Sequence, residues 1–136
     1  PGRVRSDIAS TLDIFPTFLA LADVALPTDR TIDGVSMLPI LFETGPGRRK
    51  EFFYWRGRTL MAVRKGPWKA HFFTEPGYGG KRVRHDPPLL FHLEHDPSER
   101  FNLNAKYPKV VEELKRLAEK HKSTIKPFPC QLESTL

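Results

Sequence analysis

The chain has 136 residues, of which 39% are hydrophobic and 28% charged, a composition that excludes a disordered polypeptide and indicates one globular domain or part of one. Its formal net charge of +6 would suit an anionic partner. However, the clusters Arg48-Arg49-Lys50 and Lys81-Arg82-x-Arg84 lack the interleaved aromatic residues on which proteins that bind single-stranded nucleic acid stack the bases. We therefore expect solvated cations and no nucleic-acid partner, and with no run near the roughly 18 apolar residues of a membrane span, the sequence predicts no such span.

The first predicted element is a helix over residues 13–22. Asp13 is the expected N-cap, and Pro16 is tolerated in the first turn because amides there have no intrahelical partner. Apolar residues cover almost the whole helix surface: Leu12, Phe15, Phe18, Leu19, Leu21 and Ala22. A helix of this kind needs a covering partner, so we expect an adjoining domain or a homo-oligomer formed through residues 13–22.

The middle of the chain predicts an antiparallel meander. It follows a short helical turn that Ser36 caps and that runs through Leu41 to Gly45. Four runs rich in aromatic and β-branched residues are separated by turn signals, the last after a long loop over residues 75–84: Glu51–Arg56, Thr59–Lys65, Trp68–Thr74 and 89–93.

The last predicted element is an amphipathic helix over residues 107–124. Val110, Leu114, Leu117 and His121 recur at spacings of four, three and four, and Pro108 stands near the start. This stripe should cover one face of the sheet. The predicted fold class is therefore α+β, a four-stranded antiparallel sheet packed by a C-terminal helix and preceded by a helical segment.

The stretch HDPPLLFHLEHDPSERFNL, residues 85–103, groups three histidines with several acids as a metal site might. His92 differs from His85 and from His95 by an odd number of positions, so each pair points to opposite faces of an extended chain. His85 and His95 share a face but would lie roughly 33 Å apart along a straight strand. We therefore predict no metal site here, and interpret Asp96-Pro97-Ser98-Glu99 as a turn with structural or solvated acids.

Four pieces of the sequence, taken in order, resemble the C-terminal third of sulfatases of the arylsulfatase A and steroid sulfatase type. They are LDIFPTFLALA, IDGVSMLPIL, WKAHFFT and HDPPLLFHLEHDPSERFNL, and the resemblance covers about residues 1–120. It implies that residues 1–46 are the C-terminal edge of a larger α/β catalytic domain, truncated here, and that residues 47–136 are the sulfatase C-terminal domain. The chain opens on Pro-Gly without an initiator Met, as expected of a fragment.

The resemblance also implies that the parent enzyme hydrolyses sulfate esters with a calcium ion and a formylglycine made from Cys in a Cys-x-Pro-x-Arg motif. Cys130 is followed by Gln-Leu-Glu and does not match that motif, and the metal-binding Asp-Asp and Asp-Asn pairs have no counterpart. We therefore expect no catalytic and no metal-binding residue in this chain. The fragment alone should be inactive and should need the upstream catalytic domain as its partner.

Three residues are candidates for contact with the sulfate ester. His85 matches a histidine of some family members, and an imidazole can donate to a sulfate oxygen. The alternative is that His85 caps its loop or faces solvent. His71 and Lys69, both in the piece WKAHFFT, are the other candidates, with a packed strand histidine and a solvated lysine as their respective alternatives.

Two other functions remain open. The chain is alternatively a basic accessory module that binds a polyanion, such as a sulfated glycan or nucleic acid, through Arg82 and Arg84. It is alternatively an oligomerisation module that uses the apolar helix. With Cys130 as its only cysteine the chain forms no internal disulfide, and the contrast with Cys-rich vertebrate family members favours an exported bacterial protein, although the compartment stays undetermined.

Overall fold

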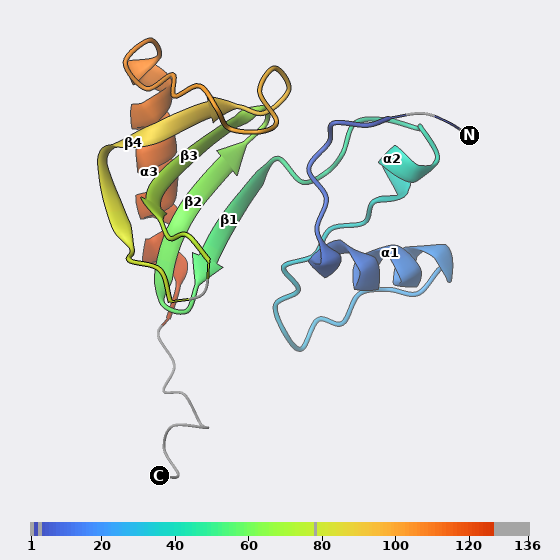
Figure 1. Cartoon of the computed structure of the whole chain (residues 1–136). Helices are drawn as coiled ribbons and strands as arrows, with labels where there is room; N and C mark the ends of the chain where they lie inside the picture. The colour runs from blue at the N-terminus through green and yellow to red at the C-terminus, as the bar shows by residue number, and fades with distance from the viewer. Residues whose placement is uncertain (1, 3, 78, 127–136) are drawn as a thin grey trace.

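The computed structural model describes residues 2, 4–77 and 79–126 (Figure 1). The N-terminal part holds a 3-10 turn and two short helices: η1 (Thr11–Asp13), α1 (Ile14–Leu21) and α2 (Leu38–Leu41). The remainder forms a sheet and one long helix: β1 (Glu51–Arg56), β2 (Thr59–Lys65), β3 (Trp68–Thr74), β4 (Val83–His92) and α3 (Pro108–Thr124). Figure 1 shows α3 along one face of the sheet and the N-terminal part beside the β1 edge. No helix in the described residues is long and apolar enough to cross a membrane.

The strands form one antiparallel sheet in the order β1-β2-β3-β4, which confirms the predicted meander. Gly57 and Gly66 make the first two turns with φ of +56° and +54°, a left-handed conformation that glycine adopts without a Cβ penalty. The first three strands have their predicted bounds. The α+β fold class is therefore confirmed.

The prediction for the fourth strand was wrong at its start. β4 begins at Val83 rather than Leu89, and it ends at His92. Its first residues pair with the end of β3 beyond a shift in the register of the ladder. Pro87 and Pro88 lie inside that irregular stretch, where the absence of a backbone N–H breaks no ladder hydrogen bond. The two prolines therefore led to a predicted strand that lacks the first half of β4.

The core lies between α3 and the sheet. It comprises seven buried residues: Leu60, Val63, Ala70, Leu90, Val111, Leu114 and Ala118. Of the predicted helix stripe, Leu114 is central, Val110 and Leu117 pack partly buried at the margin, and His121 stacks on Phe53 at 3.6 Å between ring centroids. The buried stripe is therefore wider than predicted, as is usual for a helix that covers a sheet. Burial of each large side chain contributes about 1.5 to 3 kcal/mol.

The N-terminal helix also agrees with its prediction, since Asp13 and Ala22 are the caps of α1. The role predicted for the Asp13 side chain was wrong, because it makes no hydrogen bond to α1. It accepts hydrogen bonds from the backbone N–H of Ser10 and Val35 and from the Arg49 guanidinium. Arg49 was expected to be solvated, yet its side chain is only 12% exposed and that of Asp13 only 1%.

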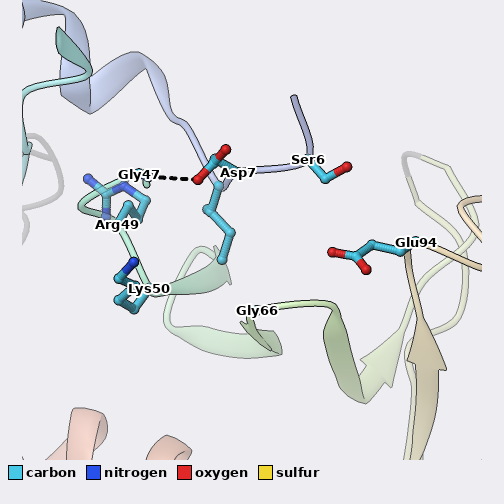
Figure 2. A pocket seen from close by; sticks show the side chains of 8 residues that line it. Ser6, Asp7, Gly47, Arg49, Lys50, Gly66 and Glu94 are labelled. Atoms are coloured by element: carbon cyan, nitrogen blue, oxygen red, sulfur yellow. Dashed lines mark hydrogen bonds between the residues drawn. The ribbon is translucent and has the colours of Figure 1, made fainter. Parts of the chain in front are cut away.

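Asp13 and Arg49 thus join the N-terminal part to the chain just before β1. A second link lies nearby, where Asp7 Oδ1 accepts a hydrogen bond from the Gly47 N–H at 2.7 Å (Figure 2). Within the N-terminal part, Gly34 permits the close return of the chain past η1, because a Cβ at this position would stand 2.0 Å from the backbone oxygen of Leu12. Polar contacts rather than a large apolar core therefore hold residues 4–46 against the segment that leads into β1.

Candidate functional site

The face of the sheet that α3 leaves uncovered carries a polar cluster. Side chains alternate along β3, so that Ala70 packs under α3 while Lys69 and His71 point to the opposite face. Lys69 Nζ lies 4.6 Å from the centroid of the Tyr54 ring on β1, a cation–π distance. Glu99 comes to the same face from the loop after β4. We call Tyr54, Lys69, His71 and Glu99 the Glu99 cluster.

Glu99 lies between Lys69 and His71 and contacts both of them. Its Oε1 accepts a hydrogen bond from Lys69 Nζ at 2.7 Å, and its Oε2 lies 2.7 Å from His71 Nε2 without the alignment of a hydrogen bond. All three side chains are at most 25% exposed. A partly buried pair of this kind is more effective than an exposed one, because water screens it less.

The turn before Glu99 gives this carboxylate its direction. Asp96 Oδ2 accepts hydrogen bonds from the backbone N–H of Arg100 and Phe101, at 2.7 and 2.8 Å, which confirms the predicted turn role of Asp96. Glu99 itself has φ of +54°, an unusual conformation for a residue with a Cβ. Backbone strain of this kind is frequent at functional sites, and here it accompanies a carboxylate that holds two candidate residues.

The electrostatics of the cluster favour a neutral His71. Burial lowers the pKa of His71 below the usual 6.5, the Lys69 ammonium lowers it further, and the Glu99 carboxylate offsets only part of the decrease. A histidine with a lowered folded-state pKa stabilises the fold above pH 6.5, and this contribution is lost as the pH falls through its folded value. At neutral pH, Lys69 and Glu99 therefore form an ion pair beside an uncharged imidazole.

The pKa of His71 should respond in opposite directions to two substitutions. Glu99→Gln should lower it further, because the anion is removed while burial and Lys69 remain. Lys69→Met should raise it, because a neighbouring cation is lost. Titration of the imidazole C–H signals by NMR measures both, with His121 as an internal reference because neither residue influences its pKa. Shifts of the same sign in the two variants would contradict the described geometry.

His85 borders the Glu99 cluster without joining it. Its Nε2 lies 2.8 Å from Thr74 Oγ1, so the ring is anchored to the end of β3. Thr74 lines a concavity of about 280 Å³ together with Tyr54, Lys69 and His71. The other side of His85 lines a cavity of about 460 Å³ between β4 and α3. The structure thus brings Lys69 and His71 into contact through Glu99 and places His85 at their margin.

Sequence reasoning missed Glu99 and Tyr54 as members of this site. Glu99 was interpreted as a turn residue or a solvated acid. The hydrogen bond from its backbone N–H to the Asp96 carbonyl oxygen confirms the turn, while the contact with Lys69 contradicts the solvated acid. The signal was present, since Asp96-Pro97-Ser98-Glu99 stood among the pieces shared with sulfatases. Tyr54 had no signal, because only the pairing of β1 with its neighbours places it near Lys69.

Cations proposed for a polyanion site are engaged elsewhere in the fold. Arg82 Nε lies 3.0 Å from Glu75 Oε2 and its Nη1 donates to Thr59 Oγ1 at 2.6 Å. Arg84 lies 3.8 Å from Asp86. This arrangement neutralises much of the Lys81–Arg84 cluster, so the basic stretch seen in the sequence is not an open cationic surface.

A further cavity of about 240 Å³ lies where the N-terminal part meets the sheet (Figure 2). Asp7 and Arg49 line it but are committed to the contacts that link the two parts. Figure 2 shows the Glu94 carboxylate reaching toward this space from the side opposite Arg49 and Lys50. This cavity lies at the junction of the two parts and contains none of the predicted site residues.

The described residues do not fit the groups that the sulfatase resemblance implies. Within residues 2, 4–77 and 79–126, no three His, Cys, Asp or Glu side chains are grouped so that they could hold a metal ion. His92 and His95 stack in parallel at 4.1 Å between ring centroids, which is not the arrangement of two ligands around one ion. Cys130 lies outside the described residues.

Comparison with known proteins gives matches to sulfatases. Residues 47–136 match the family described as the C-terminal region of aryl-sulfatase. The chain is 37% identical to N-acetylgalactosamine-6-sulfatase of Canis lupus familiaris, over 96% of the chain and 30% of that protein. It is 36% identical to arylsulfatase A of Homo sapiens, over 86% of the chain and 27% of that protein. The chain therefore spans less than a third of the length of these relatives.

Solved structures share the fold. A Bacteroides thetaiotaomicron protein described in connection with the metabolism of multiple glycosaminoglycans has a TM-score of 0.62 at 31% identity, over 82% of this chain and 24% of its own. The PsFucS1 sulfatase from Pseudoalteromonas sp. has a TM-score of 0.72 at 24% identity, over 86% of this chain and 26% of its own. Since the family match covers more than half of the chain, the chain belongs to the sulfatase family and corresponds to the C-terminal region of its aryl-sulfatase members.

Proposed function

We propose that this chain works as the C-terminal part of a sulfuric ester hydrolase. The observation that carries the proposal is the match of residues 47–136 to the aryl-sulfatase C-terminal region. In this proposal residues 47–136 are the C-terminal domain, and residues 1–46 are the edge of the catalytic domain. The links from Asp7 to Gly47 and from Asp13 to Arg49 support such a junction, because they fix the two parts against each other.

The chain contributes a wall of the substrate cleft in this proposal. His85 is the residue best suited to touch a sulfate oxygen, since its ring is anchored by Thr74 and lines the cavity of about 460 Å³. Lys69 and His71 act differently, because Glu99 holds both of them and balances the lysine charge. They orient the wall and offer hydrogen bonds, while a strong anion trap would require free cations.

The bond-breaking apparatus would lie in the upstream part of the protein. In sulfatases a hydrated formylglycine supplies the nucleophile beside a calcium ion, and the described residues fit neither group. This chain therefore completes the fold and shapes the cleft. No reaction step is assigned to its side chains.

The partner of the N-terminal part would be that upstream domain. The outer face of α1 is strongly apolar and open, with Phe15, Phe18 and Leu21 at 48%, 64% and 54% exposure. Soluble surfaces seldom leave a patch of this kind uncovered. We infer that the upstream domain packs on this face, and that copies of the isolated chain would associate through the same residues.

Kinetics of the whole gene product test the proposed wall. His85→Ala should lower kcat/KM for a sulfate ester by about ten- to a hundredfold, mainly through KM, because a hydrogen bond to a charged group is lost on binding. His85→Gln, which keeps a partner for Thr74, should lose less. His95→Ala is the matched control, since this exposed histidine stacks only on His92. Equal effects of His85→Ala and His95→Ala would remove His85 from the site.

A further inference from the structure

Another cavity, distinct from the three described above, opens on the α3 side of the sheet, where the helix ends beside the β1–β2 turn. Its volume is about 600 Å³, within the range of small-molecule sites. The lining combines aromatic, aliphatic and basic side chains: Trp55, Arg58, Leu60, Phe73, Lys122, Ile125 and Lys126. Among the described residues, no acidic side chain lines this cavity, so its charged groups are all positive. Leu60 and Phe73 add apolar surface.

The aromatic wall of this cavity is fixed in place. The Trp55 indole N–H donates to His121 Nε2 at 3.2 Å, and the two rings lie 5.9 Å apart between centroids. Trp55 remains 37% exposed, while Leu60, its cross-strand partner on β2, is only 3% exposed. A rigid indole with one side open offers a flat apolar surface at low entropic cost, as recognition sites for rings require.

The cations around the cavity are largely unpaired. Arg58 and Lys126 have no ion-pair or hydrogen-bond partner among the described residues. Lys122 Nζ lies 2.9 Å from Glu119 Oε1, an exposed pair that an incoming anion can replace at small cost. Arg58 and Lys126 therefore offer unpaired charge to this cavity, which lies on the opposite side of the sheet from the Glu99 cluster.

The cavity also continues along the sheet. Phe73 and Lys122 line it together with the neighbouring cavity of about 460 Å³, whose lining adds the cations Arg84 and Lys115 and the acids Asp86 and Glu119. A ligand longer than one ring could therefore pass from the indole toward β4. Single-strand nucleic-acid grooves present successive exposed aromatic residues to successive bases. Of the aromatic residues that line these two cavities, Trp55 is exposed, whereas Phe72 and Phe73 are partly buried.

We propose that this cavity binds a sulfated sugar residue of a glycan chain, with the apolar face of the ring on Trp55 and the sulfate between Arg58 and Lys126. The choice of sulfate over another anion rests on the proposed sulfate-ester function. The presence of the cavity and its positive charge are independent of that proposal. Binding here would hold a polymeric substrate on the C-terminal domain. The site thus adds retention of the glycan to the wall formed by the Glu99 cluster and His85.

Binding of a sulfated heparin hexasaccharide to the chain tests this proposal without catalysis. Titration calorimetry should detect binding, and the indole N–H signal of Trp55 should shift in NMR spectra. A fully desulfated hexasaccharide of the same length should bind at least about tenfold more weakly, because charge-assisted hydrogen bonds are lost. Equal binding of the two probes would mean that carboxylates suffice, and would overturn the assignment to sulfate.

Variants locate the binding on the surface. Arg58→Ser with Lys126→Ser should weaken binding at least about tenfold, and since both side chains are exposed the fold should be unchanged. Lys109→Ser with Lys120→Ser removes the same charge from exposed positions of α3 outside the cavity and should change binding less than about threefold. Trp55→Leu should also weaken binding, with the sheet signals retained.

Two outcomes would overturn the proposal. Equal losses in the two double variants would reduce the interaction to unspecific charge attraction, and an absence of binding to the sulfated probe would remove the site. Neither outcome bears on the proposed hydrolase, because the probe is bound and not cleaved. Conversely, failure of the His85 kinetics would leave the binding measurement intact.

Discussion

Asp13→Ala should lower the free energy of unfolding of the N-terminal part by about 3 to 5 kcal/mol, the range for breaking one partner of a buried ion pair. Asp13 is 1% exposed and accepts hydrogen bonds from two backbone N–H groups as well as from Arg49. Its removal leaves the two backbone donors without an acceptor, and leaves the nearly buried guanidinium with only its hydrogen bond to the Asp33 carbonyl oxygen. Local unfolding should follow, since few apolar residues hold this part.

Hydrogen exchange and limited proteolysis measure this effect where it arises. In Asp13→Ala, the amide of Val35 should lose its protection while the amides of β2 keep theirs, because the sheet has its own core with α3. Asp29→Ala is the matched control, since the pair of Asp29 with Arg30 is exposed and water screens it, so its loss should leave the fold unchanged. Equal protection at Val35 in both variants would show that Asp13 does not hold the segment.

The same carboxylate makes the stability of the segment depend on acid. Burial alone would raise the pKa of Asp13, but the hydrogen bonds from Arg49, Val35 and Ser10 hold it below its usual 3.8. A group with a lowered folded-state pKa gives its full stabilisation above 3.8 and loses it as the pH falls through the folded value. Protection at Val35 should therefore fall in this acidic range, and the Asp13→Ala variant should lack this dependence.

Local patterns in the sequence predicted most of the regular structure. The first three strands needed only alternating residues and turn glycines such as Gly57 and Gly66. The helix α3 needed only its apolar period. The first half of β4 was not predicted, because Pro87 and Pro88 are unusual in a strand. Pairing with β3 nevertheless keeps this irregular stretch in the sheet.

Contacts between distant residues could not be predicted in the same way. Asp13 and Arg49 are 36 positions apart, and their pairing depends on how the chain returns past η1 before entering β1. Lys69 and Glu99 are 30 positions apart in the sequence. The left-handed backbone of Glu99 could not be predicted either, because glycine is the usual signal for this conformation and position 99 is a glutamate. The candidate site was therefore predicted as separate residues, and its geometry came only from the fold.

The division of labour proposed for this protein gives the second large prediction. Enzymes commonly accelerate their reactions by a factor of about 10⁶ or more, so a chain without the catalytic groups should show no turnover at all. The upstream coding sequence should contain a Cys-x-Pro-x-Arg motif, which the 136 residues of this chain do not. Cys130→Ser should leave hydrolysis by the whole product unchanged, since Cys130 is not followed by that motif.

Hydrolysis of an aryl sulfate, assayed side by side for the whole gene product and for this chain, tests the central claim most directly. We predict turnover by the whole product, with loss on chelation of divalent ions, and no turnover by the chain above the rate in buffer. Hydrolysis by the chain alone that survives both chelation and Cys130→Ser would contradict the account, because the catalytic centre would then lie among these residues.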